Sequence, residues 1–474
     1  MRQRSIFLKI GAAIVCNKNN PRETFIMKIG FAVGDITPEI GLFLTGYGNP
    51  ERIATGVHSP LCASVMVMGD ETKIGAVIVL DWCTLDESIA WDMRKGIEEA
   101  SGIKAEDIII CCTHTHSAPN TRRSVTAGRS ACDPEQKGVK YAYDSIKVLA
   151  AAVNEAKNNM RDCTAGFGST KTKTGVSRRG TNRFGKVSGF IEDPYLMHDD
   201  NMTVVRFKDS QNGNDLGIFV HCSAHNTSMG ANRDYSSDWC GIMRERIRDR
   251  YNVPVVFLNG AIGDSGPRTN RWMVFKSVYG FSAGGGDGIK AAEEVGFRAA
   301  SDALRCLEDI KDFRSALPFT VLHNELRIPQ ALSMSKEKAE KVVQEYEAAN
   351  PVIPDEPDRT YQVAKSNLAA WKLPPEPELV IKQTIISFGP LAFLPFPFEM
   401  FSMFSLRLRK YSNLEYPLLC SIGNGYYGYM PDRAAFAMGG YEVEWLCFAR
   451  NYVIAQNAGD IAVTQTLDAL DKLE

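Results

Sequence analysis

The sequence predicts an α/β fold, with mixed, buried β-sheets flanked by helices and an active site at strand ends. Short apolar runs alternate along the 474 residues with amphipathic stretches of helical spacing, which is typical of α/β proteins. The run Ile108–Cys112 is apolar throughout, as expected for a strand covered on both faces. Hydrophobic residues make up 44% of the chain and charged residues 23%, so a core of ordinary size is expected.

The individual elements follow from the same periodicities. Short apolar runs bounded by turn residues predict strands, and the first two bracket a hairpin-like turn at Gly69. The predicted strands are residues 63–68, 74–80, 108–112, 203–207, 217–222, 255–258, 320–327, 382–387, 391–394 and 418–422. Apolar residues at helical spacing predict the remaining elements. The predicted helices are residues 87–100, 140–158, 238–250, 288–307, 337–349, 399–410 and 460–473.

Residues 27–474 are expected to form a single domain, preceded by an extension or a degenerate signal at residues 1–26. Arg2 and Arg4 open a segment whose apolar stretch is short and interrupted by Lys9, which matches a secretory signal poorly. A membrane-spanning helix needs about 18 or more consecutive apolar residues, and the sequence contains no such run. No transmembrane segment is therefore predicted.

Charge and cysteine content restrict the partners and the compartment. The net charge is -2 and the pI is near 6.4, whereas nucleic-acid-binding proteins usually carry a basic excess, so no nucleic-acid partner is expected. The 12 cysteines include no Cys-x-x-Cys pair, and several lie in apolar runs. This pattern favours reduced core thiols and a cytoplasmic location. A periplasmic or secreted location stays open if residues 1–16 act as a signal.

Two of the 7 histidines directly follow the predicted strand at residues 108–112. His114 and His116 lie in a Thr-His-Thr-His-Ser run at the carboxyl end of that strand, where ligands bind in open α/β sheets. If the backbone stays extended, both imidazoles point the same way. One would then bind a metal while the other faces the substrate or a metal-bound water. Two surface or internally satisfied histidines are the alternative.

A third candidate histidine follows another strand. His225 lies just past the apolar run at residues 217–222, in a His-Asn-Thr-Ser-Met sequence. His221 lies inside that run and is expected to be a core residue. Neutral imidazole is the commonest metal ligand, and two histidines from separate strand ends suit zinc.

Three further segments place polar groups at predicted strand ends. The Gly-rich turn at residues 259–267 either offers amides to an oxyanion or is a sharp turn in which Asp264 caps local amides, and the second interpretation is preferred. Glu399 is expected at a helix N-terminus, where the helix dipole stabilises a carboxylate. The segment at residues 424–429 is rich in glycine and tyrosine, a composition that more often packs loops than binds metals.

Together these segments resemble the catalytic domain of the neutral, non-lysosomal ceramidase family, in order from Met27 to Tyr441. The His-Thr-His-Ser and His-x-Thr-Ser-Met elements are specific as an ordered pair. The resemblance implies an α/β fold with one Zn²⁺ ion per chain at strand ends. The implied zinc ligands are His114, His225, Glu399 and Tyr429. The implied catalytic residues are His116 near the metal-bound water, Arg178 (or, alternatively, Arg179) and the substrate-contacting Tyr441.

Three features depart from the family pattern. Gly266 stands where the family has the serine of Gly-Asp-x-Ser-Pro, and Ser265 is shifted by one position. Phe398 stands where the family has the glycine of Pro-Gly-Glu. Both changes are expected to alter the substrate pocket. No C-terminal β-sandwich domain of the family is expected after the catalytic domain.

The resulting hypothesis is a zinc-dependent hydrolase that cleaves the amide bond of a small or lipid-like N-acyl substrate. Zinc lowers the pKa of bound water from ~15.7 to about 7, which supplies a nucleophile near neutral pH. His116 would orient that water or move protons, and Arg178 and Tyr441 would stabilise the oxyanion or hold the substrate. A serine mechanism through Ser265 lacks the Gly-x-Ser-x-Gly frame.

A second hypothesis from a different class is a non-catalytic, zinc-containing binding protein on the same fold. The changes at Gly266 and Phe398 motivate it. A catalytic zinc site keeps an open coordination position, whereas a structural site is closed. Coordination geometry therefore separates the two hypotheses.

Overall fold

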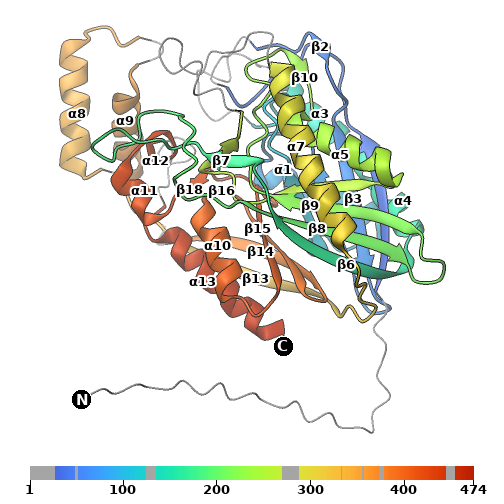
Figure 1. Cartoon of the computed structure of the whole chain (residues 1–474). Helices are drawn as coiled ribbons and strands as arrows, with labels where there is room; N and C mark the ends of the chain where they lie inside the picture. The colour runs from blue at the N-terminus through green and yellow to red at the C-terminus, as the bar shows by residue number, and fades with distance from the viewer. Residues whose placement is uncertain are drawn as a thin grey trace, which may run out of the picture.

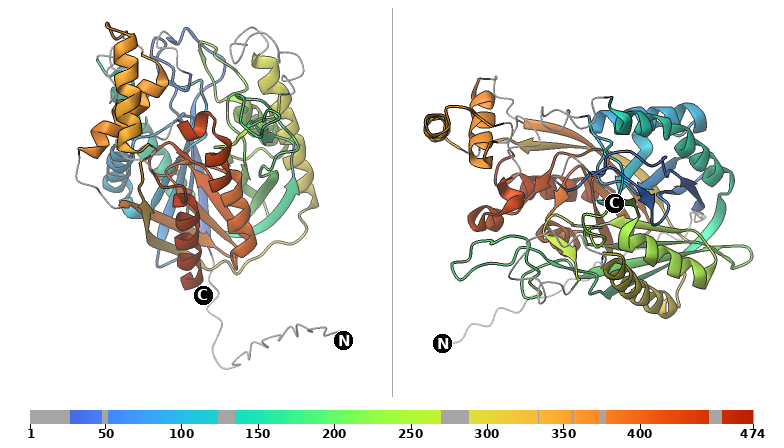
Figure 2. Two further views of the ribbon diagram at one scale, coloured as in Figure 1. Left: turned by 90° about the vertical axis from the view of Figure 1, so that its left-hand side faces the viewer. Right: turned by 90° about the horizontal axis from the view of Figure 1, so that it is seen from above.

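A computed structural model describes residues 27–47, 52–123, 135–269, 288–332, 334–354, 357–372, 378–444 and 454–473. Three sheet segments surround a shared core, and each carries helices on its outer face (Figure 1; Figure 2). The view from above in Figure 2 shows them as three sectors: the N-terminal part in blue and cyan, the central part in green and yellow, and the C-terminal part in orange and red. The predicted α/β fold with mixed, buried sheets is confirmed.

The first two sheet segments form one eight-stranded sheet with the order β11-β9-β8-β6-β1-β3-β4-β5. The first segment comprises β1 (Lys28–Asp35), β3 (Cys62–Gly69), β4 (Ile74–Leu80) and β5 (Ile108–Cys112). The second comprises β6 (Arg161–Lys171), β8 (Asn201–Asp209), β9 (Asp215–Cys222) and β11 (Val255–Asn259). Only Lys28↔Asp162 and Ile29↔Arg161 pair β1 with β6. Strand β11, at one edge, also contacts β3, β4 and β5, so the sheet bends and its two edges approach each other.

The third segment is a four-stranded sheet with the order β13-β14-β15-β17. Its strands are β13 (Phe319–Pro329), β14 (Glu378–Phe388), β15 (Leu391–Phe396) and β17 (Tyr416–Ser421). Side chains from all three segments meet in the shared core, among them Met66, Phe219 and Phe393. Strand β17 contacts both β5 and β11, so it lies between the two edges of the bent sheet.

Helices bury the outer face of each segment. Helices α1 (Glu87–Ser101), α3 (Lys137–Asp144) and α4 (Ile146–Asn158) cover the first segment. Helices α5 (Asp238–Tyr251) and α7 (Gly288–Asp309) cover the second. Helices α10 (Ser402–Tyr411) and α13 (Ala458–Leu470) cover the third. Helices α8 (Lys336–Ala349) and α9 (Arg359–Trp371) pack on each other and project from the body (Figure 1). None of the helices in the described ranges is long and apolar enough to cross a membrane.

Short two-stranded ribbons support the carboxyl ends of the long strands. They are β2 (Gly56–Val57) with β10 (Asp234–Tyr235), β7 (Gly175–Ser177) with β12 (Ser265–Pro267), and β16 (Glu399–Met400) with β18 (Tyr429–Met430). Helices α11 (Arg433–Met438) and α12 (Tyr441–Glu444) follow the last ribbon. Most of the polar side chains discussed below lie on or beside these ribbons.

The predicted elements agree with the structure except in particular places. The helix expected at residues 140–158 is divided at Ser145 into α3 and α4. The helix expected at residues 399–410 begins only at Ser402, so Glu399 does not lie at a helix N-terminus. Strands β1 and β6 and helix α9 were not predicted, because the spacing of their apolar residues matches the strand or helix period only weakly.

The cysteines agree with the expectation of reduced core thiols. Every cysteine in the described ranges is free, and all of these except Cys62 are buried. Cys16, Cys132 and Cys447 lie outside the described residues, as do residues 1–26 with their predicted extension or signal.

Candidate metal centre

The ends of β5 and β9 meet although the two strands lie in different sheet segments. Thr115 and Asn226 form a parallel β-bridge, and the amide of His116 donates to the carbonyl of Asn226. His114 and His225 follow these strands, and their Nε2 atoms lie 3.1 Å apart. Both side chains are buried. The bend of the large sheet therefore brings together two histidines separated by more than 100 residues.

Glu399 reaches the same point from the third sheet segment. Its Oε2 atom lies 3.1 Å from Nε2 of His225 and 3.5 Å from Nε2 of His114. Glu399 is held by the ribbon β16–β18, in which it pairs directly with Tyr429. The helix dipole acts on another carboxylate, because Oδ1 of Asp264 accepts hydrogen bonds from the amide and hydroxyl of Ser402 at the start of α10.

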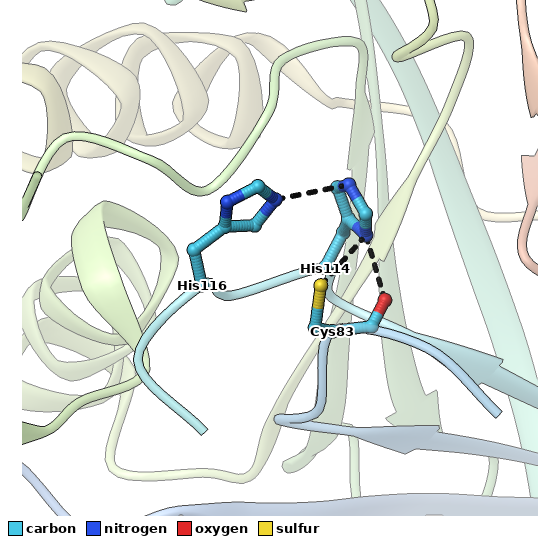
Figure 3. Close-up of side chains that lie close together, drawn as sticks. All are labelled: Cys83, His114 and His116. Atoms are coloured by element: carbon cyan, nitrogen blue, oxygen red, sulfur yellow. Dashed lines mark hydrogen bonds between the residues drawn. The ribbon is translucent and has the colours of Figure 1, made fainter. Parts of the chain in front are cut away.

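His114 and His116 converge for a reason other than the expected extended backbone. His114 has a φ of 65°, in the left-handed region, so the condition of an extended backbone is not met. Its amide donates to the carbonyl of Trp82 and its Nδ1 to the carbonyl of Cys83, and these bonds turn the chain. The Nε2 atoms of His114 and His116 nevertheless lie 3.3 Å apart, and Figure 3 shows the two rings facing each other above Cys83.

The hydrogen bonds at Nδ1 determine which ring nitrogens carry hydrogen. Nδ1 of His114 lies 2.6 Å from the carbonyl oxygen of Cys83, and Nδ1 of His225 lies 3.1 Å from that of Ser265. A carbonyl only accepts, so each Nδ1 donates and each neutral imidazole keeps its lone pair on Nε2. With both rings neutral, two lone pairs and the Oε2 of Glu399 face one another, and in the described structure this buried oxygen has no hydrogen-bond donor.

A zinc ion fits this arrangement. Tetrahedral zinc with Zn–N distances of about 2.0–2.1 Å separates its ligand atoms by about 3.3 Å. Three measured separations agree with that value. The two Nε2 atoms lie 3.1 Å apart, and Oε2 of Glu399 lies 3.1 Å from Nε2 of His225 and 3.5 Å from Nε2 of His114. His114, His225 and Glu399 thus form a three-residue group whose ligand atoms all lie within 4.8 Å. Two imidazoles and a carboxylate are a ligand set that zinc prefers.

The pKa values of the three cluster residues depend on burial and on one another's charge. Burial, together with the nearby Arg178 guanidinium, lowers the pKa of His225 to about 3. Burial also lowers the pKa of His114, but its contacts with Cys83 and Glu399 outweigh this, and the net pKa lies well above the usual value. Burial opposes ionisation of Glu399, yet His114 and His225 hold the pKa of this carboxyl well below its usual range. Positive charge beside Glu399 is thus stabilised at His114 and opposed at His225.

Arg178 lies at the edge of the cluster and connects its parts. Its Nη1 atom lies 3.0 Å from Nε2 of His225, and its Nη2 donates to the Tyr429 hydroxyl at 3.1 Å. Its Nε donates to Glu442, which also binds Arg179. Between the two candidate arginines, only Arg178 contacts the residues of the cluster in the described structure, whereas Arg179 donates to Glu442 and to backbone carbonyls of the α11 segment.

The tyrosines and His116 line the same region. Burial and Glu399 raise the pKa of Tyr429 well above its usual value, so its phenolate would form only beside a cation. The Tyr441 ring lies 5.9 Å from that of Tyr429 and 4.9 Å from that of Phe190. His116 is half-buried, its ring lies 5.0 Å from that of Tyr47, and burial lowers its pKa well below the usual value.

The turn at residues 259–267 has a structural role. The amides of Gly260, Ala261 and Gly263 donate to protein acceptors, so they offer nothing to an oxyanion. The Ser265 hydroxyl donates to the carbonyl of Ser223 at 3.0 Å rather than to a histidine. A side chain at Gly266 would contact Cβ of Arg178 at 3.5 Å, an ordinary distance, so this position faces the Arg178 side chain.

Phe398 differs from the expectation drawn from the sequence. Its ring is fully buried in the core of the third segment, 5.6 Å from the ring of Tyr427. Neighbouring residues of an extended chain point to opposite sides, so a bulky ring next to Glu399 packs away from the ligand cluster.

Sequence reasoning missed four residues that contact the cluster. The carbonyl of Cys83 binds His114, and the hydroxyl of Tyr426 binds Glu399. Arg178 contacts the other two, Glu442 and Phe190. Cys83 had a usable signal, since it follows the predicted strand at residues 74–80. Tyr426 lies in the tyrosine-rich segment that was assigned to loop packing, and Glu442 directly follows Tyr441.

Part of the sequence is similar to known ceramidases. The family model described as neutral/alkaline non-lysosomal ceramidase, N-terminal, matches residues 27–254. Neutral ceramidase 2 of Arabidopsis thaliana is 25% identical over 261 residues, which cover 49% of this chain and 33% of that protein. The chain thus matches about a third of the length of this relative.

Solved structures of relatives share the fold. The crystal structure of neutral ceramidase from Pseudomonas aeruginosa superposes with a TM-score of 0.70 at 17% identity and covers 95% of this chain and 74% of that chain. A ceramidase complexed with C2 gives a TM-score of 0.70 at 16% identity, over 95% of this chain and 75% of that one. Residues 27–254 of this chain thus resemble the N-terminal domain of the neutral/alkaline non-lysosomal ceramidase family, and the chain as a whole shares the fold of the solved ceramidase structures.

Proposed function

We propose that this protein is a zinc-dependent hydrolase that cleaves the amide bond of a lipid-like N-acyl substrate. One observation carries the proposal: the Nε2 atoms of two histidines and one carboxylate oxygen converge in a buried position. In the described structure that oxygen has no hydrogen-bond donor. The match of residues 27–254 to a ceramidase family model supports the amide substrate, and a structural relative is a ceramidase complexed with C2.

His114, His225 and Glu399 would hold one zinc ion, with the Tyr429 hydroxyl as a further ligand. Tyr429 is the direct β-bridge partner of Glu399, which places the two residues side by side. The bond from Arg178 to the Tyr429 hydroxyl supports the same assignment, because it stabilises a phenolate more than a phenol.

When bound, a zinc ion supplies a Lewis acid that activates water and polarises a carbonyl. His116 is the candidate proton carrier, because its Nε2 lies 3.3 Å from Nε2 of His114, at the edge of the ligand cluster. Arg178 is the candidate oxyanion donor, since its guanidinium lies at the cluster with its Nε fixed by Glu442. Tyr441 and Phe190 form an aromatic wall beside Arg178 that would hold an apolar part of the substrate.

The test combines metal analysis with a substrate panel. Metal-loaded protein is incubated with N-acyl compounds from lipid amides to small acyl amino sugars, and free amine is measured. We expect one zinc per chain and amine release from a lipid amide, with both lost in His225→Ala. His323→Ala is the matched control, because this half-exposed histidine contacts Asp107 away from the cluster.

The outcomes separate the hypotheses. Protein that is never exposed to chelator and yet carries no stoichiometric metal contradicts the proposal. Stoichiometric zinc with substrate binding but without amine release favours the non-catalytic binding protein. Loss of activity in Ser265→Ala with zinc retained would support a serine mechanism instead.

A further inference from the structure

The two oxygens of Glu399 have different surroundings. Oε2 faces the Nε2 atoms of His114 and His225 at 3.5 and 3.1 Å. Oε1 instead accepts a hydrogen bond from the hydroxyl of Tyr426 at 2.7 Å. A carboxylate binds a metal through one oxygen or through both. In this chain the Tyr426 hydroxyl already binds Oε1, one of the two oxygens.

Tyr426 is itself held firmly by the rest of the protein. It lies between Asn424, whose amide donates to Ile110 of β5, and Tyr427, whose amide donates to Pro397 at 2.7 Å. The guanidinium of Arg122 lies 5.0 Å from the centre of the Tyr426 ring. The hydroxyl therefore approaches Glu399 from a segment anchored on both sides, so it does not follow the carboxylate if that group rotates.

We propose that Tyr426 is a positioning residue that keeps Glu399 bound to the metal through Oε2 alone. The inference rests on the proposed function, because it concerns the same ion. Its physical basis is that rotation of the carboxylate toward two-oxygen binding would break the 2.7 Å bond from Tyr426. Outer hydrogen bonds of this kind orient metal ligands and strengthen binding.

The consequence concerns the coordination number. If Glu399 bound through both oxygens, with His114, His225 and Tyr429, the protein would supply five ligand atoms. With one oxygen it supplies four, which leaves room for a water or a substrate oxygen in a five-coordinate shell. Catalytic zinc sites need such a position, and closed sites lack it. Tyr426 would therefore keep the centre catalytic rather than structural.

Adjacent tyrosines allow a matched test. Tyr426→Phe removes the hydroxyl on Oε1, whereas Tyr427→Phe removes a neighbouring hydroxyl that binds Glu87 instead. The full chain is freed of metal, and binding of Zn²⁺ and Co²⁺ is titrated. We expect Tyr426→Phe to weaken zinc binding by about 10- to 100-fold and Tyr427→Phe to leave it unchanged. Visible absorption of the Co²⁺ form should weaken in Tyr426→Phe alone, as the coordination number rises.

A measurement on the wild-type chain complements the variants. Infrared difference spectra with and without Zn²⁺ report how a carboxylate binds, since one-oxygen binding separates its two stretching bands more widely than two-oxygen binding. We expect the wide separation. This test stands even if Tyr426→Phe fails to fold, which thermal unfolding of each variant reveals.

Several results would overturn the inference. Equal zinc affinity and Co²⁺ spectra in wild type and Tyr426→Phe would do so while leaving the proposed function intact. Equal losses in Tyr426→Phe and Tyr427→Phe would show that packing of the segment matters rather than the bond to Glu399. A wild-type chain that binds no metal would overturn both the inference and the proposed function.

Discussion

The two sides of the candidate metal centre are built differently. The histidine side consists of His114, His116 and His225, which follow the long, buried strands β5 and β9. The carboxylate side consists of Glu399, Tyr426 and Tyr429, which lie on the two-residue strands β16 and β18 or between them and β17. Long strands hold the first side, whereas a two-residue ribbon and individual hydrogen bonds hold the second.

Asn424 connects the two sides. Its amide donates to the carbonyl of Ile110, and its Oδ1 accepts from the amide of the same residue at 2.8 Å. It thus pairs with the edge strand β5 as a further strand would. His114 follows that strand and Tyr426 follows Asn424, so this contact links the two sides of the centre. The comparison indicates that strand ends supply ligands, and that a loop pinned to a strand aligns them.

The largest expected effect comes from breaking the histidine side. A metal at about a thousandfold excess over its dissociation constant stabilises a folded protein by about 4 kcal/mol. We expect His114→Ala to lose all of this stabilisation, because the Nε2 ligand is removed. Thermal unfolding with and without chelator checks it: chelator should lower the melting temperature of wild type and leave that of His114→Ala unchanged. A chelator-sensitive His114→Ala protein would contradict the assignment.

Arg178, which joins the two sides, should give the next largest effect. Lysine keeps the charge but lacks the planar fork that contacts His225 and Tyr429 together. Loss of an oxyanion donor lowers kcat by about 100-fold or more. We therefore expect about a 100-fold lower kcat for Arg178→Lys with zinc content retained.

Arg179→Lys is the matched control for that prediction. Arg179 binds Glu442 but contacts none of the ligand residues in the described structure. Its substitution should affect thermal stability more than kcat. The reverse pattern, with Arg179→Lys the slower enzyme, would transfer the catalytic assignment to Arg179.

Asn424→Ala should lower the free energy of unfolding, because it removes the contact between the two sides of the centre. The change leaves the buried amide of Ile110 without its acceptor, which costs about 1–3 kcal/mol. It also places alanine at a φ of 57°, in the left-handed region. Denaturant unfolding should show a loss of about 2–3 kcal/mol in all. Asn424→Gly separates the causes, since glycine tolerates this φ; a stability equal to wild type in both variants would contradict the role of Asn424.

The last expected effect is a change in the pH dependence of stability. Burial raises the pKa of Asp264 from 3.8 to about 7. Its protonated form is thus favoured in the folded state, so its contribution to stability is lost as the pH rises from about 4 to about 7. Asp264→Asn keeps the acceptor for Ser402 and removes this titration.

The measurement is the free energy of unfolding as a function of pH. Over that window the slope for Asp264→Asn should differ from wild type by up to about 1.4 kcal/mol per pH unit, the value for one proton. Parallel curves for the two proteins would show that Asp264 does not titrate there.

The periodicity of the sequence predicted most of the long elements. Strand β5 was predicted at the residues where it occurs, because Ile108–Cys112 is apolar throughout and bounded by polar residues. Strands β1 and β6 were missed, since glycine and polar residues interrupt their apolar pattern. The helix start near Glu399 was misplaced, because a two-residue bridge to Tyr429 has no local signal.

The sequence by itself determined the fold class, the strand ends that carry His114 and His225, and the resemblance that pointed to Glu399 and Tyr429. These depend on local patterns and on motifs within short segments. Only the tertiary structure decided that the ends of β5 and β9 meet, that His114 turns through a left-handed backbone, and that Tyr426 holds one oxygen of Glu399. The physical reason is that these contacts join segments far apart in the chain, and their geometry depends on how the sheet bends rather than on any neighbouring residue.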